Sequence, residues 1–327
     1  MLETAASFVN AAIIQSIPLL FGATGEIITE KSGNLNLGIP GIMYVGGISG
    51  IIGGYIYEHS VETTTPILCI LISLVSSLIG SALMALIYAF LTQTLKANQN
   101  VTGLALTTFG VGVGNFFGGS LLKLFNESGS ISLLDTGLAY KTSLPFASKL
   151  GLFGNTFLSF GFLAYAAIII AIISSFILNK TRVGLNLRAI GENPATADAA
   201  GINVTRYKYL STIIGGMIAG LGGLYFVMDY TAGAWTNNSF GDRGWLAVAI
   251  VIFALWKPKS AIFSSFIFGG LYIICVYIPG LSSSAKEIIK MLPYLVTILV
   301  LIVISARKKK EHQPPQSLGL TYFREER

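Results

Sequence analysis

Residues 157–178 read FLSFGFLAYAAIIIAIISSFIL, a stretch without a single charged side chain. A helix needs about 20 such residues to cross the roughly 30 Å hydrocarbon core of a bilayer. The stretch also lacks the strict alternation of polar and apolar residues that barrel strands show. Because only helices and closed barrels satisfy all backbone polar groups in lipid, it predicts a transmembrane helix.

The rest of the chain has the same character. Hydrophobic residues make up 53% of its 327 positions and charged residues only 11%, whereas soluble domains carry about 25% charged residues. We therefore predict an all-α polytopic membrane protein with about nine transmembrane helices. The predicted spans are residues 5–28, 38–56, 66–95, 99–122, 157–178, 209–230, 244–256, 261–280 and 288–306. The seventh is short, which favours a broken helix formed together with the polar residues before it.

The distribution of lysine and arginine predicts the orientation. If RKKK at 307–310 is cytoplasmic, alternation of the spans places the N-terminus outside. The segments then placed inside are Lys31, Lys96, residues 180–208, Lys257 and Lys259. Up to residue 310 this gives thirteen Lys and Arg inside and six outside, as the positive-inside rule requires.

The same charges limit the choice of partners and domains. Loops that face anionic lipid head groups explain the net charge of +6, so we expect no nucleic-acid partner. We divide the chain into a membrane domain, 1–306, and a cytoplasmic tail, 307–327. Within it, the mixed charges and the Pro314–Pro315 pair of residues 311–327 predict a short disordered end.

Catalytic and metal-binding patterns are absent from the sequence. Cys69 and Cys275 each lie in an apolar span far from another thiol, and His59 and His312 fall in a loop and in the tail. No GxxxxGK[ST] phosphate loop occurs. We therefore expect no catalytic residue, no metal and no bound cofactor, and the energy for any transport must come from a gradient or a partner.

Two polar segments interrupt the apolar sequence. The first break, Gly25–Gly41, reads GEIITEKSGNLNLGIPG, and the second, Trp235–Gly244, reads WTNNSFGDRG. Each ends in GxxG before an apolar stretch, and five spans separate the starts of the two halves. An odd number of spans turns the second half upside down, so the pattern predicts an inverted repeat with broken helices near its centre.

These breaks are candidates for a solute pathway. Irregular backbone at membrane depth is tolerated only where protein or water satisfies it, and amides can both donate to and accept from sugar hydroxyls or base edges. The alternative is that the polar residues only cap helix ends at the membrane surface. The candidate pathway residues are Ser32, Asn34, Asn36, Gly38, Gly41, Trp235, Asn237, Asn238 and Gly241.

A polar loop, KTRVGLNLRAIGENPATADAAGINVTRYK at 180–208, separates two apolar spans. Pro194 stands where a helix can begin, alanines favour its continuation, and Gly201 can end it. We therefore predict a short surface helix, on the cytoplasmic side of the proposed topology.

Four segments resemble a known family. GEIITEKSGNLNLGIPGIMYVGG (25–47) is similar to the N-terminal signature of permease subunits of bacterial nucleoside ABC importers, within the branched-chain amino acid and ribose permease family. Further similar blocks are LKANQNVTGLALTTFG (95–110), GLNLRAIGENPATADAAGINVTRYKYLSTIIGGMIAGLGGLYF (184–226) and GDRGWLAVAIVIFALWKP (241–258). Pro40 and the bulky FALW at 253–256 depart from the family pattern, which leaves the solute open.

The resemblance implies a transport subunit of the bacterial plasma membrane. Its partners would be a second permease subunit, a cytoplasmic ATP-binding subunit that uses the ATP, and an extracytoplasmic substrate-binding lipoprotein. The resemblance also assigns the ATPase contact to the middle of the 180–208 loop. The residues so assigned are Gly191, Glu192, Asn193, Pro194, Ala199, Ala200 and Gly201.

Other functions remain compatible with the residues. A permease for branched-chain amino acids or a simple sugar fits the same family pattern. A gradient-driven carrier could titrate Glu26, Glu30 or Asp229 within the membrane, but the polar 180–208 loop would then have no evident task. A structural or assembly subunit would need no polar breaks in its spans.

Overall fold

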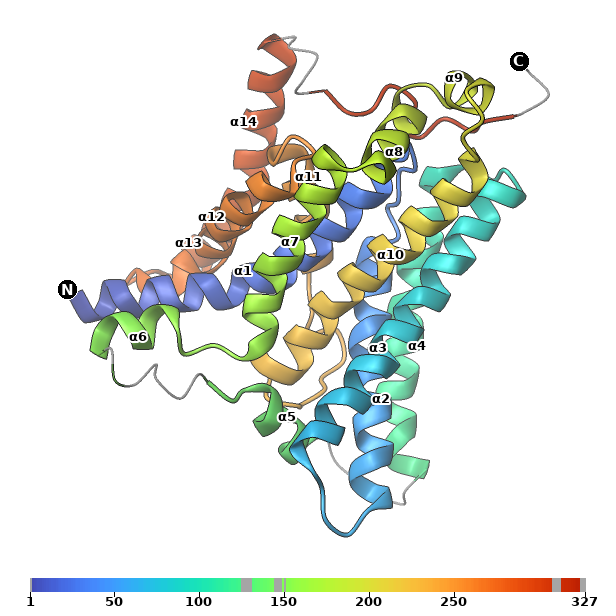
Figure 1. Cartoon of the computed structure of the whole chain (residues 1–327). Coiled ribbons are helices and arrows are strands. Elements are labelled where there is room, and N and C mark those ends of the chain that lie inside the picture. The colour runs from blue at the N-terminus through green and yellow to red at the C-terminus, as the bar shows by residue number, and fades with distance from the viewer. Residues whose placement is uncertain (1, 125–130, 144–148, 150, 308–312, 324–327) are drawn as a thin grey trace.

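The structure is a computed structural model that describes residues 2–124, 131–143, 149, 151–307 and 313–323. In these ranges the chain is helical apart from its connections, and the only β pairing is a single bridge between Ser132 and Ala234. The helices (Figure 1) are α1 (Leu2–Glu30), α2 (Ile39–Ser60), α3 (Pro66–Ala89), η1 (Phe90–Thr94), α4 (Gln99–Leu124), α5 (Leu134–Tyr140), α6 (Gly151–Phe157), α7 (Phe162–Lys180), α8 (Arg182–Glu192), α9 (Pro194–Ala199), α10 (Val204–Tyr225), η3 (Phe226–Tyr230), α11 (Arg243–Phe253), α12 (Pro258–Tyr277), α13 (Ser283–Lys290) and α14 (Leu292–Arg307).

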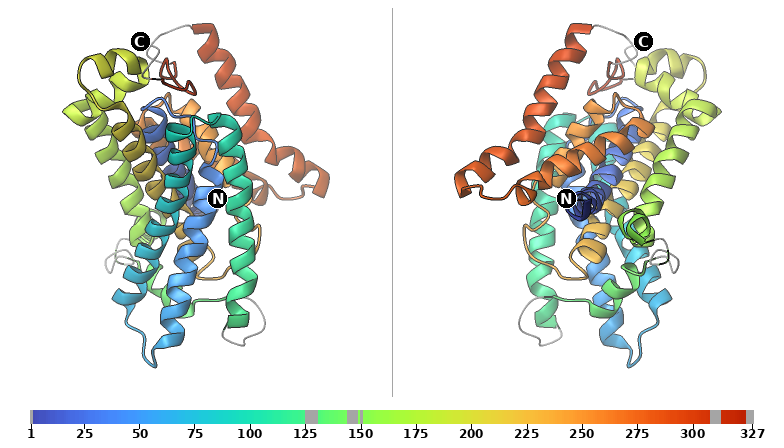
Figure 2. Two further views of the ribbon diagram at one scale, coloured as in Figure 1. Left: turned by 90° about the vertical axis from the view of Figure 1, so that its right-hand side faces the viewer. Right: turned by 90° about the vertical axis from the view of Figure 1, so that its left-hand side faces the viewer.

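Seven described helices are long and apolar enough to cross a membrane, judged by length and composition. They are the helices at Glu3–Glu30, Ile39–Ser60, Pro66–Thr94, Gln99–Lys123, Phe162–Lys180, Val204–Tyr230 and Pro258–Tyr277. The other two of the nine predicted spans form shorter helices, α11 with 11 residues and α14 with 16. Two views turned by 90° show α14 standing away from the bundle (Figure 2).

Helix α3 shows the polarity expected of a helix in lipid. Its outward side is apolar, with Ile67, Leu71, Val75, Ile79 and Leu83 all exposed at a spacing of four residues. Its inward side carries Ser73, Ser77 and Ser81, which are fully buried. A helix of a soluble protein places its residues the other way round. The exposed apolar side therefore suits contact with acyl chains.

Helices α1, α2 and α10 meet at the centre of the bundle through glycines. A Cβ added at Gly46 of α2 would lie 2.5 Å from the Cα of Gly220 in α10, and one at Gly223 would collide with the carbonyl oxygen of Met43. Without side chains the two backbones approach closely, which lets polar and packing contacts form between them. The sequence analysis did not assign these glycines to a site, and packing is the role they have.

This packing gives a first prediction. Replacing Gly223 by alanine is expected to lower the melting temperature of the purified protein, because overpacking a tight contact costs about 1–3 kcal/mol. The matched change is Gly112→Ala in α4, where an added Cβ meets nothing within 4 Å. Thermal unfolding in detergent compares the two variants. Equal melting temperatures would show that the α2–α10 contact can relax at no cost.

The polar segments gather at the two ends of the bundle (Figure 1). At one end lie α8, α9, the residues 313–323 and the connection from α3 to α4. At the other end lie the loop between α2 and α3 and helix α5, where Glu58 accepts hydrogen bonds from Thr136. The basic segments predicted to share one side of the membrane are thus brought to one end of the molecule.

Candidate functional site

The first break is shorter than the sequence predicts. Helix α1 continues to Glu30, and only residues 31–38 leave helical geometry before α2 begins. The buried carboxylate of Glu26 accepts a hydrogen bond from the backbone nitrogen of Asn36 at 3.0 Å. The Asn36 side-chain oxygen in turn accepts from the backbone nitrogen of Gly38 at 2.9 Å. These bonds satisfy donors that the missing helical turn leaves unpaired.

The other polar side chains of the first break hold it to neighbouring helices. Asn34 donates to the hydroxyl of Thr212 in α10 at 3.0 Å, and its side-chain oxygen accepts from Gln93 in η1 at 3.0 Å. Ser32 donates to the carbonyl of Thr29 at 2.7 Å. The break is therefore bonded on both sides by the chain itself.

The predicted pathway residues of the first break lie in the interior. Ser32, Asn34 and Asn36 are 0% exposed. Gly38 and Gly41 pack against α4, where a Cβ added at Gly41 would lie 2.6 Å from the carbonyl oxygen of Leu106. These buried residues therefore fix the shape of the break.

A second contact joins the first break to the far end of α11. The carboxylate of Glu30, at the last turn of α1, accepts a hydrogen bond from the indole nitrogen of Trp256. Leu255 and Trp256 both have positive φ, at 55° and 54°, a conformation that bulky side chains rarely adopt. The FALW segment that departs from the family pattern is thus a specific turn against Glu30.

The second break spans the residues between η3 and α11, and its GxxG reaches the first. A Cβ added at Gly244 would lie 2.5 Å from the Cα of Pro40. The GxxG ends of the two breaks therefore contact each other, although the local structure around each is different.

A triangle of polar side chains organises the second break. The backbone nitrogen of Asn238 donates to the hydroxyl of Tyr44 at 2.8 Å, and this hydroxyl donates to Asn115 at 2.6 Å. The amide of Asn115 donates to the side-chain oxygen of Asn238 at 3.1 Å. Asn238 has φ of 60°, which asparagine tolerates better than most residues. The contacts link α2, α4 and the break.

Aromatic rings stand beside these amides. The rings of Tyr44 and Trp235 meet edge to face with centroids 5.1 Å apart, and Phe240 lies 6.5 Å from Tyr44. The indole nitrogen of Trp235 donates to the side-chain oxygen of Asn237 at 3.0 Å. Asn237, like Asn238, is exposed. The second break therefore presents accessible amides, and the rings of Tyr44, Trp235 and Phe240 lie buried beneath them.

Arg243 fixes the other side of the second break. Its guanidinium donates to the carbonyl of Phe240 at 2.9 Å and to Gln15 of α1 at 3.2 Å. It also lies over the rings of Phe226 and Tyr272, at 4.5 and 4.9 Å from their centroids. The buried guanidinium therefore has partners on several helices. Next to it, Gly241 is exposed with φ of 56°.

Tyr44 and Asn115 were not among the predicted site residues. The sequence did indicate Asn115, because a polar amide in the middle of the apolar stretch 99–122 is a candidate functional residue. The sequence did not indicate Tyr44, since a tyrosine in a glycine-rich span is normally interpreted as a residue of helix packing. Only the approach of α4 and the second break to α2 reveals its role.

The predicted surface helix is confirmed as α9. Asn193 caps it by accepting a hydrogen bond from the nitrogen of Thr196 at 3.0 Å, and Pro194 is its first residue. Gly201 follows its end with φ of 83°, the usual left-handed glycine of a helix C-terminus. Helix α8 precedes it, so the loop is a pair of short helices at the end of the bundle.

The predicted ATPase-contact residues divide into exposed and buried positions. Glu192, Asn193, Ala199, Ala200 and Gly201 are exposed, and Pro194 is half-buried. Gly191 is buried, and a Cβ added there would collide with the carbonyl oxygen of Lys31. Gly191 is thus a packing position under the exposed surface.

The prediction of a disordered end is wrong for residues 313–323. Ser317 donates from its hydroxyl to the carbonyl of Gly191 at 2.6 Å, and the nitrogen of Gly319 donates to the carbonyl of Gly33 at 3.1 Å. Tyr322 donates to Asp198 of α9 at 2.8 Å. Composition alone could not show that the first break and the 180–208 loop would offer backbone acceptors at one place.

The comparisons with known proteins agree with this arrangement. The sequence profile of the family described as "Branched-chain amino acid transport system / permease component" matches residues 8–301. The nucleoside ABC transporter permease protein NupC of Lactococcus lactis is 31% identical over 95% of each chain. The guanosine ABC transporter permease protein NupQ of Bacillus subtilis is 29% identical over 98% of this chain and 97% of its own.

A third relative names another solute. TsgC13 of Haloferax volcanii, an ABC transporter permease protein whose name gives glucose, is 31% identical over 98% of each chain. Identity alone therefore does not separate solutes within this family. The matched range overlaps all seven apolar helices and includes both breaks and the 180–208 loop. The chain belongs to the family of permease components of branched-chain amino acid transport systems, and it is a multi-pass membrane protein.

Proposed function

We propose that this chain is the membrane-spanning permease of an ATP-driven ABC importer for nucleosides. The observation that carries the proposal is the second break, where the exposed amides of Asn237 and Asn238 lie beside the rings of Trp235 and Tyr44. A nucleoside is uncharged and carries several hydroxyls and the polar edges of a base, so accessible amides backed by apolar and aromatic side chains suit its passage. The relatives named for nucleosides support the same solute class.

The two breaks have different parts in the proposed pathway. The second break forms the solute-facing wall, with Gly241 in its left-handed turn and Asn115 as a further amide. The first break positions that wall, because Ser32, Asn34 and Asn36 are buried and hold α1 and α2 in place. A second permease subunit faces the exposed amides and completes the pathway.

Energy coupling runs through α8 and α9. The exposed surface from Glu192 to Gly201 docks on a separate ATP-binding subunit, which hydrolyses the ATP. Residues 313–323 bond both to Gly191 and to Gly33, so a displacement of the two short helices is passed to the end of α1. If the α8–α9 pair and the end of α1 move together in this way, the spans can reorient about the pathway.

The proposed location is the bacterial plasma membrane, with the N-terminus outside and the α8–α9 end in the cytoplasm. An extracytoplasmic substrate-binding lipoprotein delivers the solute at the opposite end. A gradient-driven carrier is disfavoured by the family to which the chain belongs.

The orientation is testable by cysteine labelling. A cysteine at Thr63, exposed in the loop after α2, is expected to react with an impermeant maleimide in intact cells. A cysteine at Thr196, exposed on α9, is expected to react only after the cells are opened. The native Cys69 and Cys275 are buried and give a low background. The reverse pattern would invert the proposed topology.

The solute is tested by uptake. Cells that carry the complete importer are expected to take up labelled nucleosides in preference to branched-chain amino acids, ribose or glucose, and deletion of the gene removes this uptake. Preferential uptake of an amino acid or a sugar would assign the permease to that solute and refute the nucleoside proposal.

A further inference from the structure

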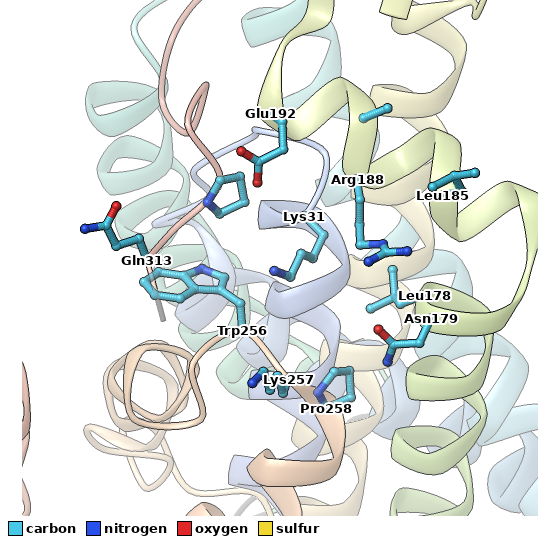
Figure 3. A pocket seen from close by; sticks show the side chains of 12 residues that line it. Lys31, Leu178, Asn179, Leu185, Arg188, Glu192, Trp256, Lys257, Pro258 and Gln313 are labelled. Atoms are coloured by element: carbon cyan, nitrogen blue, oxygen red, sulfur yellow. The ribbon is translucent and has the colours of Figure 1, made fainter. Parts of the chain in front are cut away.

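A basic pocket lies beside the coupling helices, between the end of α1, α7, α8 and the start of α12 (Figure 3). Its volume is about 490 Å³. Among the described residues that line it are three cations, Lys31, Arg188 and Lys257, and a single acid, Glu192. The excess positive charge, with a pocket of this size, calls for an anionic ligand.

The protein leaves one of these cations, Arg188, incompletely hydrogen-bonded. The Nε atom of Arg188 is buried and has no hydrogen-bond partner in the described part of the chain. Burial lowers the pKa of Lys31 from its ordinary value, and the neighbouring Arg188 and Lys257 lower it further against the opposing effect of Glu192. A bound anion would relieve both conditions, since it supplies an acceptor and offsets the repulsion among the cations.

An apolar groove of about 540 Å³ is lined by three of the helices near this pocket. It runs between α1, α7 and α12 and is lined mainly by aliphatic and aromatic side chains, among them Ile17, Leu20, Ala164, Ile168, Ile262 and Phe263. Pro258 lines the basic pocket and the next residue, Lys259, lines the groove. The two cavities share no lining residue, but consecutive residues at the start of α12 line first the pocket and then the groove.

The dimensions of the pair fit one kind of molecule. Ile168 of the groove and Leu178 of the pocket are ten residues apart on α7, a rise of about 15 Å along a helix. One leaflet of the hydrocarbon core is also about 15 Å thick. An acyl chain in the groove can therefore end at a head group in the pocket.

We propose that this pair of cavities binds an anionic phospholipid, with its phosphate among Lys31, Arg188 and Lys257 and an acyl chain in the groove between α7 and α12. Basic pockets between membrane helices suit such head groups. Because Glu192 and Arg188 belong to α8, the lipid would brace the coupling helices against α12. A free phosphate has the same chemistry in the pocket but makes no use of the groove.

The test is native mass spectrometry of the assembled importer, exchanged into nanodiscs of mixed phosphatidylglycerol and phosphatidylcholine and then released into detergent. The wild type is expected to retain phosphatidylglycerol in preference to phosphatidylcholine. Lys257→Gln and Arg188→Gln should each lower this retention about fivefold, the factor for one cation near an anionic surface. Lys257 is exposed, so its variant keeps the fold intact.

Two controls separate a built site from general surface charge. Arg182→Gln removes an exposed cation of the same helix α8 that does not line the pocket, and it should leave retention unchanged. Ile168→Trp fills the groove without changing any charge, and it should lower retention as the charge variants do. Equal loss with Arg182→Gln would reduce the effect to diffuse charge and overturn the proposal.

A competition experiment distinguishes the two sources of phosphate. Inorganic phosphate added to the nanodiscs should not displace the retained phosphatidylglycerol, because it lacks the acyl chain. If phosphate displaces the lipid and Ile168→Trp has no effect, the site binds free phosphate and the lipid proposal is wrong. None of these measurements depends on the solute, so they stand apart from the proposed function.

Discussion

Replacing Ala200 with glutamate is expected to reduce ATP-driven uptake by a factor on the order of ten or more while the permease remains in the membrane at normal abundance. Ala200 is exposed directly after α9, on the surface proposed to dock on the ATPase. A charge forced into a closely packed interface without a partner costs several kcal/mol. Uptake into cells and quantification of the permease in isolated membranes measure the two quantities.

Two further changes at the same place separate the causes. Ala200→Ser adds a small neutral group and should keep most of the activity. Gly201→Val should impair coupling through the backbone, since Gly201 has φ of 83° and an added Cβ meets no atom within 4 Å. Positive φ costs a β-branched residue on the order of 1–3 kcal/mol. Normal uptake by both Ala200→Glu and Gly201→Val would reduce α9 to an ordinary surface helix.

Replacing Asn238 with alanine is expected to lower nucleoside uptake roughly 5- to 150-fold, because losing an amide partner of a bound solute costs about 1–3 kcal/mol. The measurement is initial-rate uptake by importers of equal abundance. Asn36→Ala should behave differently: its side chain accepts from Gly38 inside the first break, so the variant lowers thermal stability and abundance, and the transporters that remain should work.

The matched control is Asn98→Ala. Asn98 is an exposed asparagine that accepts a hydrogen bond from the nitrogen of Val101 at the start of α4. This change removes a helix cap outside the pathway and should leave the uptake rate of each transporter near the wild-type value. If Asn238→Ala and Asn98→Ala have the same rate, the amide of Asn238 takes no part in solute passage.

The two breaks differ in accessibility, which their sequence patterns do not predict. Both segments are polar, glycine-rich and followed by an apolar helix, so the sequence treats them as equivalent. In the structure Asn34 is enclosed by η1 and α10, whereas Asn237 remains exposed. The difference depends on which helices pack over each break. Those neighbours come from segments more than fifty residues away, and spacing within the break does not encode them.

Residues 313–323 give the same lesson. Prolines and mixed charges predict a segment that cannot build a core, and by itself the segment indeed has little apolar surface. It is ordered by carbonyl groups that other segments leave unpaired, at Gly33 after α1 and at Gly191 in α8. Such acceptors exist only after the bundle has formed, so composition could not predict the contact.

The sequence by itself determined the class of the protein, the main membrane helices and the position of the short surface helix α9, because each follows from local rules. Uncharged stretches must be helical in lipid, and Pro194 with Gly201 sets the limits of α9. The tertiary structure alone decided which polar residues are accessible, how Tyr44, Asn115 and Asn238 meet, and that a basic pocket adjoins an apolar groove. These depend on the close approach of distant helices, which glycine contacts such as Gly46 against Gly220 permit.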